Sequence, residues 1–153
     1  MTRVAPTLTS LSDIERAAER IRGTVVRTPL IDVSRQSGRP LWLKPENLQM
    51  TGAFKLRGAY NMISSLTADS RKKGVITYSS GNHGQAVAYA ARKLGVPAVV
   101  VMPLTAPDVK VTGARNFGAE VLMEGTTSIE RKVRAEHEAK VRSLVVVPPF
   151  DHP

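Results

Sequence analysis

The stretch that decides the fold is "GVITYSSGNHGQAVAYAARKLGVPAVVVMP", residues 74–103. It begins with a short apolar run, crosses a polar loop bracketed by glycines, and continues from about Gly84 into a segment whose alanines recur at helical spacing. Gly95 closes that segment, because glycine is the favoured residue just past a helix C-terminus. A second apolar run follows. This order predicts two parallel strands joined by a right-handed helical crossover.

The same unit repeats towards the C-terminus, where helical and strand patterns alternate. Helices are expected at "APDVKVTGARNFG" (106–118) and "SIERKVRAEHEAKV" (128–141), and strands at "AEVLME" (119–124) and "SLVVV" (143–147). Upstream, "FKLRGAYNMISSL" (54–66) places apolar residues three and four apart, which predicts a half-buried helix with Lys55 in its first turn. The fold class predicted is α/β, an open parallel sheet flanked by helices.

The N-terminal third has a different pattern. "TSLSDIERAAERIRG" (9–23) predicts a capped amphipathic helix, with Ser12 as the N-cap and Glu15 three residues later. Residues 25–49 alternate Pro, Gly and Ser with short apolar runs, which indicates extended structure with a hairpin-like turn near residues 37–40. The sequence "LWLK" is the strand expected after that turn.

Composition limits the classes of function. The 153 residues suit one ordinary domain, there is no cysteine, and no apolar run approaches the ~20 residues of a membrane helix. Without a secretory pattern the expected location is the cytoplasm. The net charge of +9 raises the question of nucleic acid, but the densest basic segment, residues 130–142, interleaves glutamates with its bases and lacks aromatic platforms. We expect a solvated helical surface there, and neither a nucleic-acid nor a membrane partner.

The polar loop is the first candidate site. Parallel sheets bind ligands beyond the carboxyl ends of their strands, where loops lead into helix N-termini. "SSGNHGQ" (79–85) falls at such a point, so its backbone amides and the helix dipole face an anion. It also carries four polar side chains, those of Ser79, Ser80, Asn82 and His83. An ordinary polar turn that caps a helix remains the alternative.

Lys55 is the second candidate. A helical lysine is usually a solvated surface charge, but Lys55 stands between Phe54 and Leu56, and apolar surroundings favour a neutral amine. A neutral amine is what Schiff-base chemistry requires.

The three histidines, His83, His137 and His152, offer no metal-ligand spacing among themselves. The sequence therefore predicts an aldehyde cofactor and no metal.

Three segments together resemble a known family: "KPENLQMTGAFKLRGAYN" (44–61), "SSGNHGQAVAYAARKLGVPAVVVMP" (79–103) and "FGAEVLMEG" (117–125). They resemble the N-terminal half of the pyridoxal-phosphate-dependent threonine and serine dehydratases, a group that includes serine racemase and belongs with the tryptophan synthase β-like enzymes. The resemblance runs from about Leu11 to the end of the chain. It departs at Ala53, where many relatives have serine.

The resemblance implies roles for individual residues. Lys55 resembles the lysine that carries the cofactor and later removes the α-proton of the substrate, and Phe54 resembles the aromatic residue before it. Asn82 resembles the asparagine that hydrogen-bonds the phenolic oxygen of the cofactor. Ser80 matches the serine that racemases use as a second proton-transfer group. The substrate carboxylate would be bound by Ser79, Ser80, Gly81, Asn82 and His83.

The activity implied is dehydration and deamination of L-threonine or L-serine to a 2-oxo acid and ammonia, with pyridoxal 5'-phosphate as the cofactor. Two alternatives stay open. One is racemisation of serine, or elimination on another hydroxylated amino acid. The other is an inactive fragment, or a partner that complements a separate C-terminal half. The full-length form is expected to be a homo-oligomer acting on a small amino acid.

The family's domain plan implies three parts. Residues 1–52 would form an N-terminal arm of the large domain, residues 53–145 a small α/β domain with the lysine and the asparagine loop, and residues 146–153 the start of a truncated large domain. The glycine-rich loop that binds the cofactor phosphate would lie in the missing half. Apolar residues of the arm would then lack their usual cover. We predict that residues 1–50 are poorly ordered in the isolated chain unless it oligomerises.

Overall fold

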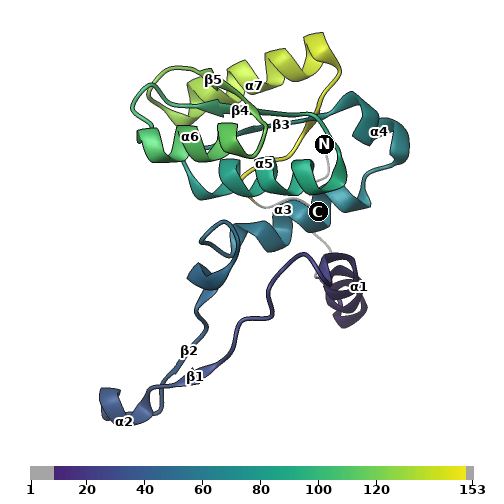
Figure 1. Ribbon diagram of the computed structural model, residues 1–153. Coiled ribbons are helices and arrows are strands. Elements are labelled where there is room, and N and C mark those ends of the chain that lie inside the picture. Colours follow the sequence, from purple (N-terminus) through teal and green to yellow (C-terminus); the bar gives the residue numbers. More distant parts are fainter. Residues whose placement is uncertain (1–8, 151–153) are drawn as a thin grey trace, which may run out of the picture.

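The computed structural model describes residues 9–150. Its centre is a sheet of four parallel strands in the order β5-β4-β3-β6 (Figure 1). The strands are β3 (Val75–Tyr78), β4 (Ala98–Met102), β5 (Glu120–Met123) and β6 (Val145–Val146). Every residue of β3 and β4 is buried, as expected for central strands covered on both faces. The predicted α/β fold class is confirmed.

Helices cover both faces of the sheet. On one face lie α5 (Asn82–Leu94) and α6 (Asp108–Asn116), and α3 (Lys55–Ser65) packs on α5. On the other face lies α7 (Ser128–Arg142), above the sheet in Figure 1. Alternate strand residues serve the two layers: Val75 and Val100 pack with α3 and α5, whereas Ile76 and Val101 pack with α7. The core is therefore two apolar layers separated by the sheet.

The charged helix α7 binds the sheet through ion pairs as well as apolar contact. Only Arg131 and Ala135 of this helix are buried. Near its C-terminus, Arg142 pairs with Glu120 of β5 at 2.6 Å, and Arg134 pairs with Glu124, the residue after β5, at 3.4 Å. The basic residues that give this segment its high charge thus include several with carboxylate partners on the protein itself.

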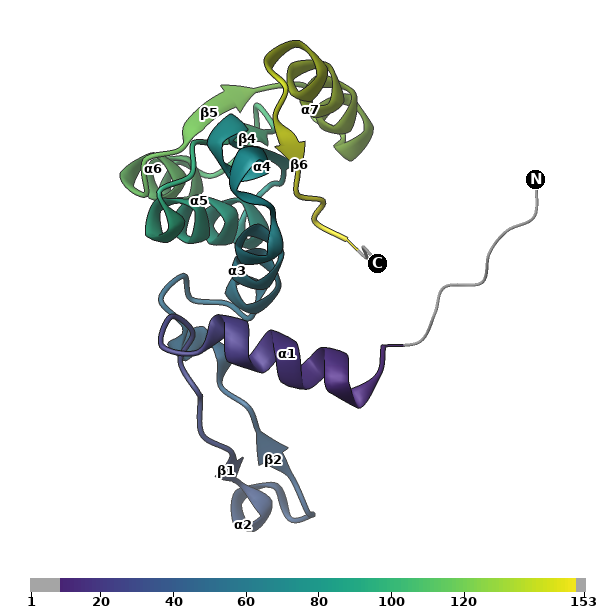
Figure 2. The same ribbon diagram turned by 90° about the vertical axis from the view of Figure 1, so that its right-hand side faces the viewer.

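The N-terminal region extends away from the α/β layers (Figure 2). Its elements are α1 (Leu11–Ile21), β1 (Ile31–Asp32), α2 (Ser34–Ser37), β2 (Trp42–Leu43) and a 3₁₀ turn, η1 (Glu46–Leu48). Strands β1 and β2 pair antiparallel, so the predicted hairpin is confirmed. Its tip is α2 followed by Gly38, whose φ of 68° suits glycine.

A polar cluster joins this region to α3. Glu46 accepts hydrogen bonds from Arg57 of α3 at 2.8 Å, from Thr28 at 2.7 Å and from Gln49 at 3.2 Å. Gln49 in turn donates to the Val26 carbonyl and accepts from the Val26 amide. The hydrogen bonds from Arg57, above all, lower the pKa of Glu46 to about 2. We call these five residues the Glu46 cluster.

Three local predictions need correction. Ser10, not Ser12, caps α1, and its capping-box partner is Asp13 rather than Glu15. Helix α5 begins at Asn82, two residues before the predicted start. The sequence analysis also missed α4 (Ala68–Lys73), which Thr67 caps by accepting from the Ser70 amide. Within residues 9–150, no helix is long and apolar enough to span a bilayer.

Candidate active site

A cleft of about 410 Å³ opens at the carboxyl end of β3. The N-termini of α5 and α7 and the segment after β6 meet there, because strands of a parallel sheet deliver their following loops to one edge. Helix α3, which follows the N-terminal region, brings its own N-terminus to the same cleft. It is lined by Lys55, Tyr78, Ser79, Ser80, Gly81, Asn82, His83, Ser128, Arg131, Pro149 and Phe150. The structure therefore brings Lys55 and the polar loop into one cleft, although they are far apart in the sequence.

Lys55 is the first residue of α3 and is half buried. Its Nζ donates to the Pro149 carbonyl at 2.9 Å and lies 5.3 Å from the centre of the Phe54 ring. Phe54 does not line the cleft, and its ring is 58% exposed. Because this hydrogen bond is to a single backbone carbonyl, the amine can turn towards a ligand when the ligand replaces that carbonyl as its partner.

The polar loop is held against the sheet by a close helix approach. A Cβ on Gly84 would lie 2.8 Å from Cγ1 of Val100, so only glycine lets the start of α5 lie this near to β4. Gly81, the N-cap of α5, makes no side-chain capping bond. The first amides of α5 therefore remain available at the cleft, where the helix dipole favours an anion.

His83 lies at the floor of the cleft and is buried. Its Nε2 is 3.2 Å from the Val147 carbonyl. Burial lowers the pKa of His83, the nearby charge of Lys55 lowers it further, and the Val147 carbonyl opposes both. His83 is consequently neutral near pH 7 and adds no positive charge beside Lys55.

Arg131 is the charged cleft residue that was not predicted from the sequence. It lies in the first turn of α7, is 8% exposed, and donates through Nη1 to the Thr126 carbonyl at 3.3 Å. Within residues 9–150 its buried Nε has no hydrogen-bond partner. A cation at a helix N-terminus opposes the helix dipole, so an anion in the cleft would satisfy both the guanidinium and the helix. One sequence signal could have identified Arg131 as buried: it lies four residues before Ala135, and so on the same face of α7.

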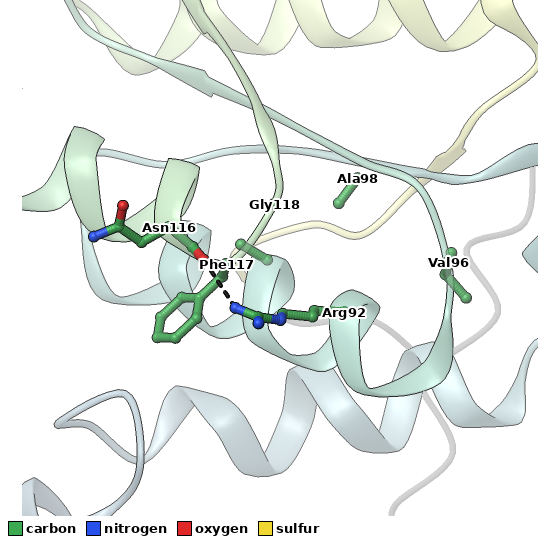
Figure 3. A pocket seen from close by; sticks show the side chains of 7 residues that line it. Arg92, Val96, Ala98, Asn116, Phe117 and Gly118 are labelled. Carbon is green, nitrogen blue, oxygen red and sulfur yellow. Dashed lines mark hydrogen bonds between the residues drawn. The ribbon is translucent and has the colours of Figure 1, made fainter.

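A second hollow, of about 390 Å³, lies away from this cleft, between the C-terminal parts of α5 and α6 (Figure 3). Arg92 donates there to the Asn116 carbonyl at 2.9 Å, and Phe117 meets Tyr89 edge to face. The remaining lining is small and apolar, apart from the Asn116 side chain. Since this hollow offers neither a nucleophile nor an acid–base pair, the cleft at Lys55 is the candidate active site.

Metal binding has no support in the described part of the chain. Within residues 9–150, no three His, Asp or Glu side chains gather where they could hold an ion. His152 lies outside that range.

The fold and the cleft define a class: an α/β protein that places a lysine opposite an anion-facing loop at the strand ends. A protein-family model described as "Pyridoxal-phosphate dependent enzyme" matches residues 21–153. The chain belongs to this family, whose cofactor is pyridoxal phosphate. The predicted resemblance is thereby confirmed.

Curated relatives include both lyases and a racemase. The chain is 40% identical over 149 residues to serine racemase of Schizosaccharomyces pombe, covering 95% of this chain and 46% of the relative. It is 44% identical over 147 residues to L-threonine ammonia-lyase of Thermotoga maritima, covering 94% and 37%. It is 40% identical over 149 residues to L-threo-3-hydroxyaspartate ammonia-lyase of Pseudomonas sp, covering 95% and 47%. The chain spans less than half the length of each.

Solved structures agree with the fold. The structure of maize serine racemase superposes with a TM-score of 0.89 at 34% identity, covering 94% of this chain and 44% of that one. The helices and strands described above correspond to less than half of the chain of maize serine racemase.

Proposed function

We propose that this chain carries the catalytic lysine and the substrate-binding loop of a pyridoxal-phosphate-dependent β-elimination, which converts L-threonine or L-serine into a 2-oxo acid and ammonia. The observation that carries the proposal is the meeting of Lys55 with the loop 79–83 in one cleft at the end of β3. Matching relatives named as threonine ammonia-lyase and threonine dehydratase support the reaction class.

The residues of the cleft fit an aldehyde cofactor. Lys55 presents an amine whose one hydrogen bond is to a backbone carbonyl, and Asn82 presents a side-chain amide at the same cleft. Bound pyridoxal phosphate supplies an electron sink for the electron pair left at Cα of the substrate when its proton is removed. In this proposal Asn82 donates to the phenolic oxygen of the cofactor, and Phe54 flanks the lysine.

The chain's own residues would divide the remaining work. Nζ of Lys55 takes the α-proton, which requires the amine in its neutral form. The free amides at the start of α5, with Ser79, Ser80 and His83, bind the substrate carboxylate. The ring of the neutral His83 gives its single N–H to the Val147 carbonyl, so His83 would contribute its backbone amide to carboxylate binding and add no charge beside Lys55. The orientation that these contacts impose favours loss of the β-hydroxyl, which leaves with a proton as water. Solvent water then hydrolyses the released unsaturated amino acid to the 2-oxo acid and ammonia.

A second candidate has a specific observation in its favour. The buried Arg131 guanidinium, with its unpartnered Nε, provides a charge that a substrate with a second carboxylate would pair with. Threonine and serine have no such group. The Pseudomonas relative is named for L-threo-3-hydroxyaspartate, which does. Elimination on a dicarboxylic hydroxy amino acid is therefore the alternative substrate class.

Two further alternatives remain open. Serine racemisation would use Ser80 as the second proton-transfer group on the face opposite Lys55, and a racemase is among the relatives. A complementation partner without its own catalysis is also compatible with a chain that spans less than half of its relatives. In either case a homo-oligomeric full-length form remains part of the proposal.

Covalent labelling tests the proposal on the chain as it exists. The purified chain is incubated with pyridoxal phosphate at low excess and reduced with borohydride, and the modified peptide is identified by mass. We expect label on Lys55 above all other lysines, and its loss in Lys55→Ala. Lys140→Ala, an exposed lysine on α7, serves as the matched control and should leave the label in place. Scattered labelling of surface lysines would refute the proposal for this chain.

The substrate class is tested by binding. Chemical shifts of the loop 79–83 are followed during titration with L-serine and, separately, with L-threo-3-hydroxyaspartate. If the dicarboxylic class holds, Arg131→Met weakens binding of the dicarboxylate at least about tenfold, since a charge-assisted hydrogen bond contributes ~1.5–3 kcal/mol. Binding of L-serine should change little. Equal losses for both ligands would contradict the dicarboxylic alternative.

A further inference from the structure

Lys110 of α6 reaches across to the start of α5. Its Nζ donates to Oδ1 of Asn82 at 2.7 Å and lies 3.5 Å from Oε1 of Gln85. Both partners are side-chain amides rather than carboxylates. Asn82 lines the cleft at Lys55 and Lys110 does not. Lys110 therefore contacts a residue of the site without lining the cleft itself.

The packing of α6 on α5 makes this reach possible. Lys110 and Gly113 are three residues apart and so share one face of α6. A Cβ on Gly113 would lie 2.0 Å from Nε2 of Gln85, so the absence of a side chain there gives Gln85 its place between the helices. The stem of Lys110 lies along Gly81, where an added Cβ would be 3.9 Å from its Cε. The contact is thus built into the helix interface.

An ammonium group determines which way the Asn82 amide faces. Because Nζ of lysine can only donate, the atom that Asn82 turns towards it must be the oxygen. The Nδ2 group then faces away from Lys110, and within residues 9–150 no protein acceptor meets it. The two Nδ2 hydrogens are left for a ligand of the cleft.

We propose that Lys110 is a positioning residue that turns the Asn82 amide so that Nδ2 donates into the cleft. The charge-assisted bond to Oδ1 also polarises the amide, which strengthens Nδ2 as a donor to an oxyanion. The oxyanion is the phenolic oxygen of pyridoxal phosphate, and to that extent the inference rests on the proposed function. Lys110 itself touches neither cofactor nor substrate.

The first test needs no cofactor. The side-chain amide pair of Asn82 is observed by ¹H–¹⁵N NMR in the wild type and in Lys110→Met, Lys110→Arg and Lys140→Met. We expect the Asn82 pair to move to the shifts of a free amide in Lys110→Met and to stay near its wild-type position in Lys110→Arg, which keeps a cationic donor. Lys140→Met is the matched control, because it removes the same group from an exposed site on α7. An unchanged Asn82 pair in Lys110→Met would overturn the inference.

The second test adds the cofactor. Lys110→Met should weaken pyridoxal phosphate binding about tenfold, from the strength of a hydrogen bond to a charged group, while Lys110→Arg stays within about threefold of the wild type. The fraction of label on Lys55 at saturation should not change, and thermal unfolding of Lys110→Met should match that of Lys140→Met. Equal affinity of Lys110→Met and the wild type would overturn the inference.

The two failures are distinguishable. If the wild-type chain places no label on Lys55, the proposed function fails for this chain, and the NMR comparison still decides whether Lys110 orients Asn82. If Lys55 is labelled in the wild type but the Asn82 side-chain amide shifts are unchanged in Lys110→Met, the proposed function stands and the positioning role of Lys110 is refuted.

Discussion

The α/β unit, residues 53–147, and the arm, residues 9–52, are stabilised by different forces. Among residues 9–150, every buried hydrophobic residue lies in the α/β unit, from Ala53 to Val147. The buried residues of the arm are polar, namely Thr28, Gln49 and Thr51. Its large apolar side chains, such as Leu30 and Trp42, are 64% and 59% exposed. Apolar burial therefore stabilises the α/β unit, whereas the arm is attached through hydrogen bonds, an ion pair and the packing of Val25 on the core.

The comparison bears on the expectation that the arm is poorly ordered in a dilute monomer. Poor order of residues 1–50 stays a prediction, and residues 1–8 lie outside the described range. The Glu46 cluster joins residues 26–49 of the arm to α3, and a hydrogen bond from Arg20 to Asn61 joins α1 to α3.

The largest effect is expected from the core. Ile63 of α3 has no exposed surface, so Ile63→Ala should lower the free energy of unfolding by about 2–5 kcal/mol through lost apolar burial and the cavity left behind. The matched change in the arm, Leu30→Ala, should stay within about 0.5 kcal/mol. Urea denaturation followed by circular dichroism measures both. Similar losses would mean that the arm has a packed core after all.

An intermediate and local effect is expected from the Glu46 cluster. Glu46→Gln removes the charge that Arg57 binds while keeping the shape, and should lower the free energy of opening of the arm by about 1–3 kcal/mol. Hydrogen exchange at the Val26 amide, which donates to Gln49, reports that opening. Exchange in β3 and β4 should not change.

The control for this variant is Asp69→Asn, which removes an exposed pair. Asp69 lies 3.7 Å from Lys72, and both side chains are more than four-fifths exposed. Such a pair contributes little, so exchange in the arm should be unaffected. Loss of protection in β4 on Glu46→Gln would contradict the separation of the two regions.

The smallest effect is expected from acid. Since the pKa of Glu46 in the folded chain is about 2, below its ordinary value of 4.5, its stabilising contribution is fully present above pH 4.5 and is lost as the pH falls towards 2. Trp42, the one tryptophan of the chain, lies in the arm hairpin, so its fluorescence anisotropy reports release of the arm. The anisotropy should fall between pH 4.5 and 2. Glu46→Gln should show a low value throughout, and an identical acid transition in that variant would exclude Glu46 as the cause.

Sequence reasoning succeeded where burial is periodic. The strands and the crossover helices from α3 to β6 were predicted in order, because apolar residues at spacings of two, or of three and four, follow directly from which face is buried. It failed where local signals are ambiguous. Ser10 with Asp13 and Ser12 with Glu15 both have capping-box spacing, and only the structure selects the first pair. Helix α4 was missed because "ADSRKK" has no apolar periodicity.

By itself, the sequence determined the α/β class, the lysine and loop as candidate site residues, and the family, since these depend on composition and order along the chain. Only the tertiary structure decided that Arg131 is buried beside the cleft instead of joining the solvated face of α7, and that Lys110 lies against Asn82. Both are single charges within charged or polar segments. Their environment is set by side chains many positions away, which the local pattern around each residue does not contain.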